Sequence, residues 1–298
     1  MTSPRRVALV VVLAGVYAVC YTAIKAGLAF APPLRFAGLR AVIGGTVLSL
    51  MLLIIGQPLF PPRRFILGTL ALAAIGTLFA YGGMFLSPGR TGAGIASVIG
   101  NTGPLIVIVL AAVFLHERVT SGKAAAMSLG FIGVGLISYP TVTDPAQSGA
   151  WAAVLPLTAA AGFAGASVLI KRLDVGGAFL RVAAWQLLVG GIALLALAAW
   201  LERDAAVVWN GRFVVLLLFL AFVGTAFATA VWYWLLQRDE VGRLSLLLFL
   251  VPVFGLGLAV TFFRESLGVL EGLGVLVTIV GLGVVAWESR TNEGRTPP

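Results

Sequence analysis

GIASVIGNTGPLIVIVLAAVFLHE, residues 94–117, decides the fold, because a related stretch, GRLSLLLFLVPVFGLGLAVTFFRE, stands at residues 242–265. Both stretches begin with Gly and end with Glu, and between these they share a Ser and a Pro at matching positions, 148 residues apart (242 − 94 = 148). The same register relates Gly76-Thr77 to Gly224-Thr225. A repeat of this length indicates that the two halves of the chain share one template.

The composition predicts an all-α membrane protein. Of the 298 residues, 60% are hydrophobic and only 10% are charged, and the mean hydropathy is +1.07. A helix needs about 20 apolar residues to cross a bilayer, where water cannot satisfy the backbone. The apolar runs predict about ten spans, near residues 7–30, 35–55, 64–86, 92–115, 121–139, 149–171, 178–200, 212–236, 242–263 and 267–287.

Five spans in each half make the second half enter the membrane from the opposite side, so the repeats are inverted. We therefore expect a first repeat over residues 1–140, a linker over 141–148 and a second repeat over 149–298. Inverted repeats are typical of transporters that open alternately to the two sides of a membrane, with the substrate path in a central cavity between the halves.

The distribution of Lys and Arg predicts the orientation. Thirteen of these residues fall on one side of the predicted spans: Arg5, Arg6, Arg63, Arg64, Arg118, Lys123, Lys171, Arg172, Arg181, Arg238, Arg243, Arg290 and Arg295. Five fall in loops of the other side: Arg35, Arg90, Arg203, Arg212 and Arg264. The positive-inside rule places both termini in the cytoplasm of a bacterial-type inner membrane. The net charge of +9 is thus explained by topology, and nucleic acid is not an expected partner.

Several features resemble the drug/metabolite transporter superfamily, in its ten-helix branch of two EamA-type halves. They are Lys25, Leu39-Arg40, Trp232-Tyr233 and the two Pro-to-Glu stretches. In whole-chain character the sequence is most similar to the aromatic amino-acid exporters of the YddG type. This resemblance implies a central cavity lined by helices one to four and six to nine, with helices five and ten at the periphery.

The two repeated stretches predict hinges. Pro104 and Pro252 each remove one backbone hydrogen bond from a long apolar helix, which permits either a static kink or a moving gate. Glu117 and Glu265 end these helices on opposite sides of the membrane, as alternating access requires.

Candidate substrate contacts are aromatic or polar side chains within the spans: Tyr17, Tyr21, Lys25, Arg40, Phe79, Ser97, Asn101, Phe163, Trp185, Gln186, Phe227, Trp232, Ser245 and Phe249. A cation within a membrane is usually paired or functional, so Arg40 and Lys25 can attract a substrate carboxylate or pair with Glu265 or Glu271. The amide of Asn101 can hydrogen-bond a substrate or bridge helices. Aromatic side chains in a bundle also serve simple packing.

All eleven Asp and Glu residues fall in loops or near helix ends, so the sequence has no mid-membrane acid for a proton or Na⁺. This pattern favours facilitated transport, although coupling through Tyr, His116 or Glu265 stays open. We expect no enzyme activity, because the sequence contains no catalytic triad, metal-ligand cluster or phosphate-binding loop, and we expect no cofactor.

The sequence therefore predicts an exporter of amino acids, aromatic ones especially, or of related amphipathic metabolites. Its partners are the small-molecule substrate and the lipid bilayer, and a monomer suffices. The alternatives are export of drugs, nucleobases or nucleotide sugars, and a non-transporting membrane scaffold, which leaves the inverted repeat unexplained.

Overall fold

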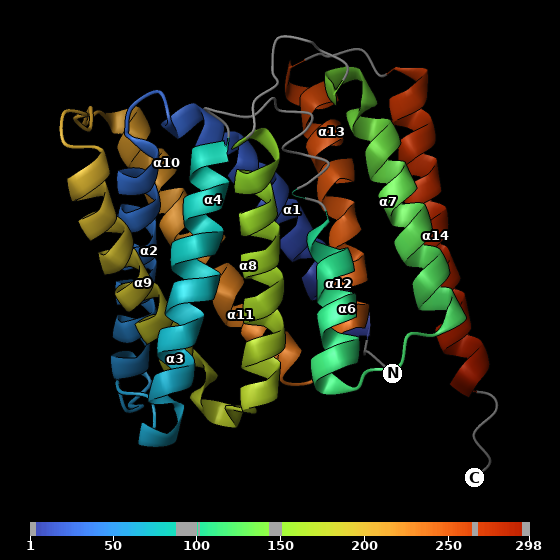
Figure 1. Ribbon diagram of the computed structural model, residues 1–298, viewed down its shortest axis with the longest axis horizontal. Helices are drawn as coiled ribbons and strands as arrows, with labels where there is room; N and C mark the ends of the chain where they lie inside the picture. Colours follow the sequence, from blue (N-terminus) through green and yellow to red (C-terminus); the bar gives the residue numbers. More distant parts are fainter. Residues whose placement is uncertain (1–3, 88–99, 101, 143–150, 264–267, 294–298) are drawn as a thin grey trace.

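The computed structural model describes residues 4–87, 100, 102–142, 151–263 and 268–293, and every regular element in these ranges is helical (Figure 1). The elements of the first half are α1 (Pro4–Gly27), α2 (Pro33–Ile54), η1 (Arg63–Phe65), α3 (Ile66–Leu72), η2 (Ala73–Phe79), α4 (Ala80–Leu86), α6 (Gly103–Leu115) and α7 (Ser121–Val142). Those of the second half are α8 (Trp151–Leu173), η5 (Gly176–Ala178), α9 (Phe179–Leu201), α10 (Gly211–Ala221), η6 (Phe222–Phe227), α11 (Ala228–Leu236), α12 (Val241–Leu246), η7 (Leu247–Phe249), α13 (Leu250–Phe263) and α14 (Val269–Glu293).

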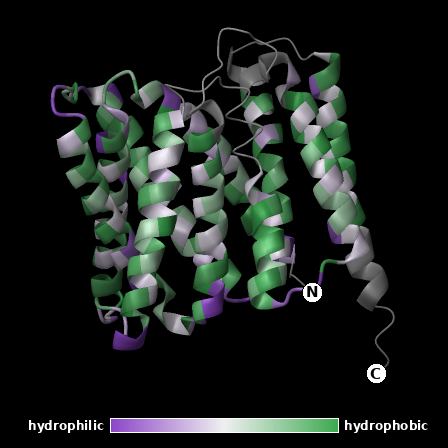
Figure 2. Ribbon diagram, in the orientation of Figure 1, coloured by the Kyte–Doolittle hydropathy of each residue, from purple (hydrophilic) through white to green (hydrophobic). Residues whose placement is uncertain are grey.

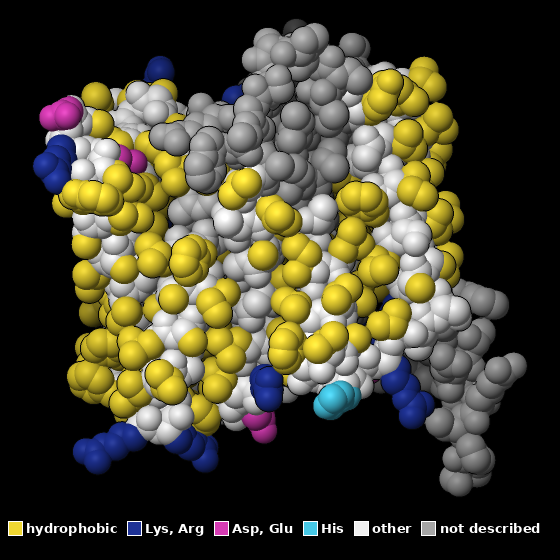
Figure 3. Space-filling model, in the orientation of Figure 1, with side chains coloured by type: hydrophobic (Ala, Val, Ile, Leu, Met, Phe, Trp, Pro, Cys, Tyr) yellow, Lys and Arg dark blue, Asp and Glu magenta, His cyan; other side chains and the backbone are white. Residues whose placement is uncertain are grey.

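These helices form a membrane bundle. In the described ranges, seven helical stretches are long and apolar enough to cross a membrane, and three shorter apolar helices cover Gly103–Leu115, Ser121–Ile137 and Val269–Val284. Apolar side chains cover the middle of the visible face, and charged side chains gather at its two ends (Figures 2 and 3). The prediction of an all-α membrane fold is confirmed, and nearly all of the ten expected spans match a described helix within a few residues.

The two halves run in opposite directions. In Figure 1, α1 begins at the lower edge of the bundle, whereas α8, which opens the second half, ends there. The halves meet where α2 packs against α9, and related glycines permit that contact. A Cβ atom on Gly45 would lie 2.9 Å from the carbonyl oxygen of Ala184, and one on Gly191 would lie 2.9 Å from the backbone nitrogen of Val42. Because both sites lack a side chain, the two backbones can approach closely.

The third helix of each half contains a π-turn at the same place. η2 (Ala73–Phe79) joins α3 to α4, and η6 (Phe222–Phe227) joins α10 to α11. Both contain the repeated Gly-Thr pair, Gly76-Thr77 in η2 and Gly224-Thr225 in η6. π-turns are rare and frequently lie at functional sites.

Both repeated prolines stand in the first turn of a helix. Pro104 follows the first residue of α6, and Pro252 is the third residue of α13, which follows the 3₁₀ turn η7. A helix start leaves its first N–H groups unpaired, so proline costs no hydrogen bond there. This holds for Pro104; around Pro252, however, α12, η7 and α13 follow one another without a gap and form one apolar stretch, Val241–Leu258, so the missing N–H of Pro252 lies within a continuous helical stretch, just after a 3₁₀ turn.

Candidate substrate cavity

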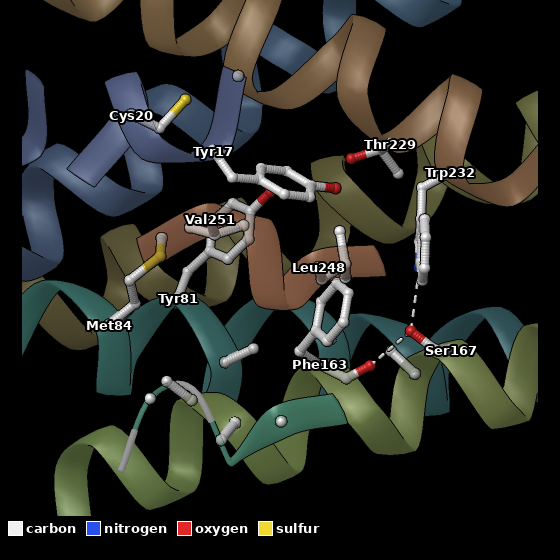
Figure 4. Close-up of a pocket in the computed structure, with 18 of the residues that line it drawn as sticks. Tyr17, Cys20, Tyr81, Met84, Phe163, Ser167, Thr229, Trp232, Leu248 and Val251 are labelled. Atoms are coloured by element: carbon white, nitrogen blue, oxygen red, sulfur yellow. Dashed lines mark hydrogen bonds between the residues drawn. The ribbon is translucent and has the colours of Figure 1, made fainter. Parts of the chain in front are cut away.

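A cavity of about 180 Å³ lies between the two halves, at the depth of both π-turns (Figure 4). Its wall is built from α1, α2, η2, α4 and α6 of the first half and from α8, α9, η6, α11, η7 and α13 of the second. A space enclosed by facing helices of two repeats is where inverted-repeat transporters bind their substrates.

Arg40 of α2 forms the charged part of this wall. Its side chain is 3% exposed. The Nε atom donates to Thr225 Oγ1 at 2.6 Å and Nη2 donates to the carbonyl oxygen of Gly224 at 2.9 Å, both within η6. The guanidinium carbon lies 4.9 Å from the ring centroid of Tyr81 and 5.7 Å from that of Phe85. These contacts hold the cation in place by hydrogen bonds and cation–π attraction.

Gln186 of α9 occupies the related place in the second half. Its Nε2 atom donates to Thr77 Oγ1 in η2 at 3.3 Å, and its Oε1 atom accepts a short hydrogen bond from the hydroxyl of Tyr233. A Cβ atom on Gly76 would lie 2.9 Å from Gln186 Nε2. The glycine of the Gly-Thr pair therefore makes room for the polar side chain that its π-turn receives.

An aromatic stack forms another part of the wall. The rings of Phe163 and Trp232 are 5.6 Å apart at an angle of 29°. The indole Nε1 of Trp232 donates to Ser167 Oγ at 3.0 Å, and Ser167 Oγ donates to the carbonyl oxygen of Phe163 at 2.8 Å (Figure 4). Leu248 and Val251 add apolar surface. This side can receive the flat face of an apolar ring.

Three tyrosines of the first half complete the lining. Tyr17 and Tyr81 point into the same space in Figure 4, and Tyr21 follows Tyr17 by one turn of α1. Their hydroxyl groups have no hydrogen-bond partner within the described residues, so they are available to a ligand.

The structure brings together seven of the residues predicted from the sequence: Tyr17, Tyr21, Arg40, Phe163, Gln186, Trp232 and Pro104 all line the cavity. Three others, Ser97, Asn101 and Glu265, lie outside the described residues. The remaining predicted contacts lie away from the cavity wall and stay predictions.

Of these, Lys25 is exposed in the last turn of α1, and Phe79 and Phe227 lie on the surface, 58% and 43% exposed. Trp185 donates its Nε1–H to the carbonyl oxygen of Leu59 and stacks on Phe60, with the ring centroids 4.9 Å apart.

Ser245 donates to the carbonyl oxygen of Val241 at 2.8 Å, within its own helix. Phe249 is fully buried against Gly130 of α7, where a Cβ atom would lie 2.7 Å from its ring. Both side chains therefore serve helix packing beside the cavity.

Glu117 joins the two halves at one end of the bundle. Its carboxylate accepts hydrogen bonds from the backbone N–H groups of Val241 at 2.7 Å and Gly242 at 3.0 Å, at the start of α12. A carboxylate at a helix start satisfies unpaired N–H groups and the positive end of the helix dipole. The last residue of the first repeated stretch thus caps the first residue of the second. Pro252, the other described hinge candidate, is half-buried in α13.

Further contacts close this same end, which we call the basic end after Arg6, Lys123 and Lys171. Arg6 pairs with Asp239 at 2.8 Å and Lys123 with Glu240 at 2.6 Å. Lys171 donates to the carbonyl oxygen of Asp239 at 3.1 Å. All three contacts involve the loop between α11 and α12, so this loop holds the basic end together.

Some residues of the site were not predicted as contacts: Tyr81 and Tyr233 line the cavity, and Thr77 and Thr225 lie behind the lining. Tyr81 and Tyr233 face Arg40 and Gln186, and Thr77 and Thr225 accept from these two side chains. The signal was present, because the Gly-Thr pair recurs in both halves and a fully buried Thr in a membrane helix needs a partner. From the sequence alone, the recurring Gly-Thr pair was used only to align the two repeats.

The cavity carries one fixed positive charge. Arg40 is a lining residue, whereas no Asp or Glu belongs to the part of the lining that the structure describes. The described ranges also contain no cluster of His, Cys, Asp or Glu that could hold a metal ion. The arrangement suits reversible binding of a small organic molecule that has an anionic group and an apolar ring.

The chain matches known transporters over most of its length. The model of the EamA-like transporter family matches residues 5–139 and again residues 150–287. The uncharacterized transporter YoaV of Bacillus subtilis is 27% identical over 271 residues, covering 88% of this chain and 90% of that protein. A probable amino-acid metabolite efflux pump of Escherichia coli is 27% identical over 278 residues, covering 90% of each.

A solved crystal structure shares the fold, with a TM-score of 0.80 at 17% identity and coverage of 97% of both chains. The matched ranges include the five described spans of each half, the π-turns and the residues around Arg40 and Trp232. The chain is therefore a multi-pass membrane protein that belongs to the EamA-like transporter family of the drug/metabolite transporter superfamily.

Proposed function

We propose that this transporter exports amino acids, aromatic ones especially, or related amphipathic metabolites, by alternating access. The observation that carries the proposal is the cavity between the halves, whose lining includes both Arg40 and the Phe163–Trp232 stack. The cation suits a carboxylate, and the stack suits a ring. The printed name of the relative from Escherichia coli, an amino-acid metabolite efflux pump, supports the same substrate class.

Transport is facilitative in this proposal, and both termini face the cytoplasm. The described cavity lining offers no carboxylate that could exchange a proton, and the basic end holds residues that the positive-inside rule assigns to the cytoplasm. The contacts of Glu117 with α12 then belong to an inner gate, which must separate when the cavity opens inward. The substrate moves down its own gradient.

Purified protein in liposomes tests the substrate. Vesicles preloaded with labelled phenylalanine or tryptophan should release it faster than protein-free vesicles, and an imposed pH gradient should leave the rate unchanged. Release of a nucleobase or a nucleotide sugar, with none of any amino acid, would refute the substrate class. A strong pH dependence would refute the facilitative mechanism only.

Glu117→Ala tests the inner gate. Loss of this cap should weaken the closed basic end by about 1 kcal/mol, equivalent to about a fivefold shift between states. Cys20, the single cysteine of the chain, lines the cavity and is buried, so a membrane-impermeant maleimide reports its access.

We expect faster labelling of Cys20 in Glu117→Ala when the reagent reaches the basic end. Glu271→Ala is the matched control, because Glu271 accepts from Gly268 within three residues and links no helices of different halves. Equal labelling rates in the two variants would refute the gate.

A further inference from the structure

Arg40 is a buried cation without a carboxylate partner in the described part of the chain. The described ion pairs at the basic end use Arg6 and Lys123. Arg40 instead contacts a hydroxyl and a carbonyl oxygen of η6, and its Nη1 atom has no hydrogen-bond partner among the described residues although it is buried. A buried charge is costly unless it is paired, so an anionic group is needed to complete this site.

The contacts of Arg40 leave a defined part of the guanidinium open. Nε and one N–H of Nη2 are used by η6, and the rings of Tyr81 and Phe85 flank the group. The N–H groups of Nη1 and the second N–H of Nη2 remain, and together they match the two oxygens of a carboxylate. Arg40 lines the cavity, and although Nη1 itself is buried, this unpaired edge is where a carboxylate would complete the hydrogen bonds of the guanidinium group.

The aromatic side of the cavity offers no charged group among its described side chains, and Thr229 adds one neutral hydroxyl there. Gln186 is bonded to Thr77 and Tyr233, and Trp232 is bonded to Ser167. A ligand gains little by placing a charge there, because these groups are neutral and most of them already have a partner. This side takes an apolar ring.

The described lining gives the ammonium group of an amino acid no carboxylate to pair with, and the free tyrosine hydroxyls offer it only neutral acceptors. The described lining contains no Asp or Glu, and the sequence places every acid in loops or near helix ends. An ammonium group lies within a few ångströms of the carboxylate of its own molecule, and therefore close to Arg40, which repels it in a low-dielectric site. The cavity thus favours a ligand with a net negative charge over a zwitterion.

We propose that the cavity recognises monocarboxylates joined to an apolar ring and requires no ammonium group, so that an aromatic 2-oxo acid is carried in preference to the matching amino acid. This inference rests on the proposed function of the cavity as the substrate path, and it deepens the substrate class.

Three labelled probes with the same ring separate the contributions: phenylpyruvate, phenylalanine and phenethylamine, each loaded into liposomes with the purified protein. We expect the half-saturating concentration of phenylpyruvate to be about tenfold lower than that of phenylalanine. Phenethylamine should leave no faster than from protein-free vesicles. An inside-negative potential should accelerate phenylpyruvate release alone, because phenylpyruvate is an anion, whereas phenylalanine is a net-neutral zwitterion and phenethylamine is a cation that this potential retains.

The variants of Arg40 test the contact itself. Arg40→Gln should lower phenylpyruvate flux about 100-fold, and Arg40→Lys should restore part of it, since lysine keeps the charge without the planar fork. Arg63→Gln is the control, because Arg63 is exposed in η1, away from the cavity. Thermal unfolding of each variant, with and without phenylpyruvate, shows whether it is folded and whether the ligand still stabilises it.

Three outcomes would count against the inference. Phenylalanine flux that equals or exceeds phenylpyruvate flux overturns it and leaves the proposed function standing, as does a folded Arg40→Gln variant with unchanged phenylpyruvate flux. Absence of flux for all three probes overturns the proposed function and this inference together. If Arg40→Gln does not fold, the Arg40→Lys variant and the voltage dependence of the wild-type protein decide.

Discussion

Arg40 and Gln186 occupy equivalent places in the two halves and contact equivalent partners, yet only one of them is charged. Arg40 donates to Thr225 of η6 at 2.6 Å, and Gln186 donates to Thr77 of η2 at 3.3 Å. The scaffold around both sites is the same: a Gly-Thr pair in a π-turn that meets the second helix of the other half. The repeat therefore supplies two matching polar sites, and sequence divergence has given them different chemistry.

A second difference determines which site remains open to a ligand. Tyr233 donates its hydroxyl to Gln186, whereas the related residue Phe85 offers Arg40 only a ring face, 5.7 Å away. Both the nitrogen and the oxygen of the amide thus have a partner, whereas the guanidinium keeps an unpaired Nη1. The asymmetry of this cavity therefore depends on pairs of related residues, and four substitutions can test it.

The largest effect is expected from Gln186→Arg, which makes the two sites alike by adding a second cation. An unpaired buried charge costs about 3 kcal/mol or more, and here Arg40 is a lining residue of the same cavity. We expect a large loss of thermal stability or of folded protein, measured by the unfolding midpoint in detergent. Gln186→Leu, which adds no charge, is the control. A Gln186→Arg variant with wild-type stability would show that the two sites are electrostatically independent.

Thr225→Val and Thr77→Val should differ in size although they are the same substitution at related places. Thr225 accepts from a charged donor at 2.6 Å, and Thr77 accepts from a neutral amide at 3.3 Å. We expect Thr225→Val to lower the free energy of unfolding by about 2 kcal/mol and Thr77→Val by about 0.5 kcal/mol. Equal losses of stability in thermal or denaturant unfolding would contradict the expectation that the hydrogen bond from the charged Arg40 is the stronger of the two.

The smallest effect is expected from Trp232→Phe, on the aromatic side of the cavity. The change keeps a ring against Phe163 but removes the donor to Ser167 Oγ. The half-saturating concentration of ring-bearing substrates should rise about threefold, as expected for one neutral hydrogen bond. Trp200→Phe, at a position that is 63% exposed in α9, should change nothing. Identical flux in both variants would remove Trp232 from the binding site.

The sequence predicted the architecture well because hydrophobic length and repetition determine it. A run of about 20 apolar residues has few alternatives to a membrane helix, and an odd number of spans per repeat requires inversion. The alignment of the two repeats also predicted that Tyr17, Arg40 and Gln186 lie in the cavity, because equivalent residues of the two halves face the same central space. The division into residues 1–140, 141–148 and 149–298 stays a prediction.

The direction in which individual side chains point could not be predicted from helical periodicity, because periodicity does not reveal π-turns and 3₁₀ turns. Phe79 and Phe227 lie in the π-turns, where the helix holds an extra residue and the facing of each side chain changes. Helical periodicity assumes 3.6 residues per turn and so assigns such residues to the wrong face. Phe249 lies in the 3₁₀ turn η7, where the same assumption fails.

Each π-turn also determines how the helix that follows it is rotated about its axis. Each residue of an α-helix turns the chain by about 100°, and a π-turn accommodates roughly one residue more than the α-helix around it. Removing one residue from η6 would rotate all of α11 by about that angle and carry Trp232 and Tyr233 off the cavity wall, while α10 stayed in place. In each half, the one extra residue of the π-turn thus sets the rotation of one end of the helix independently of the other end.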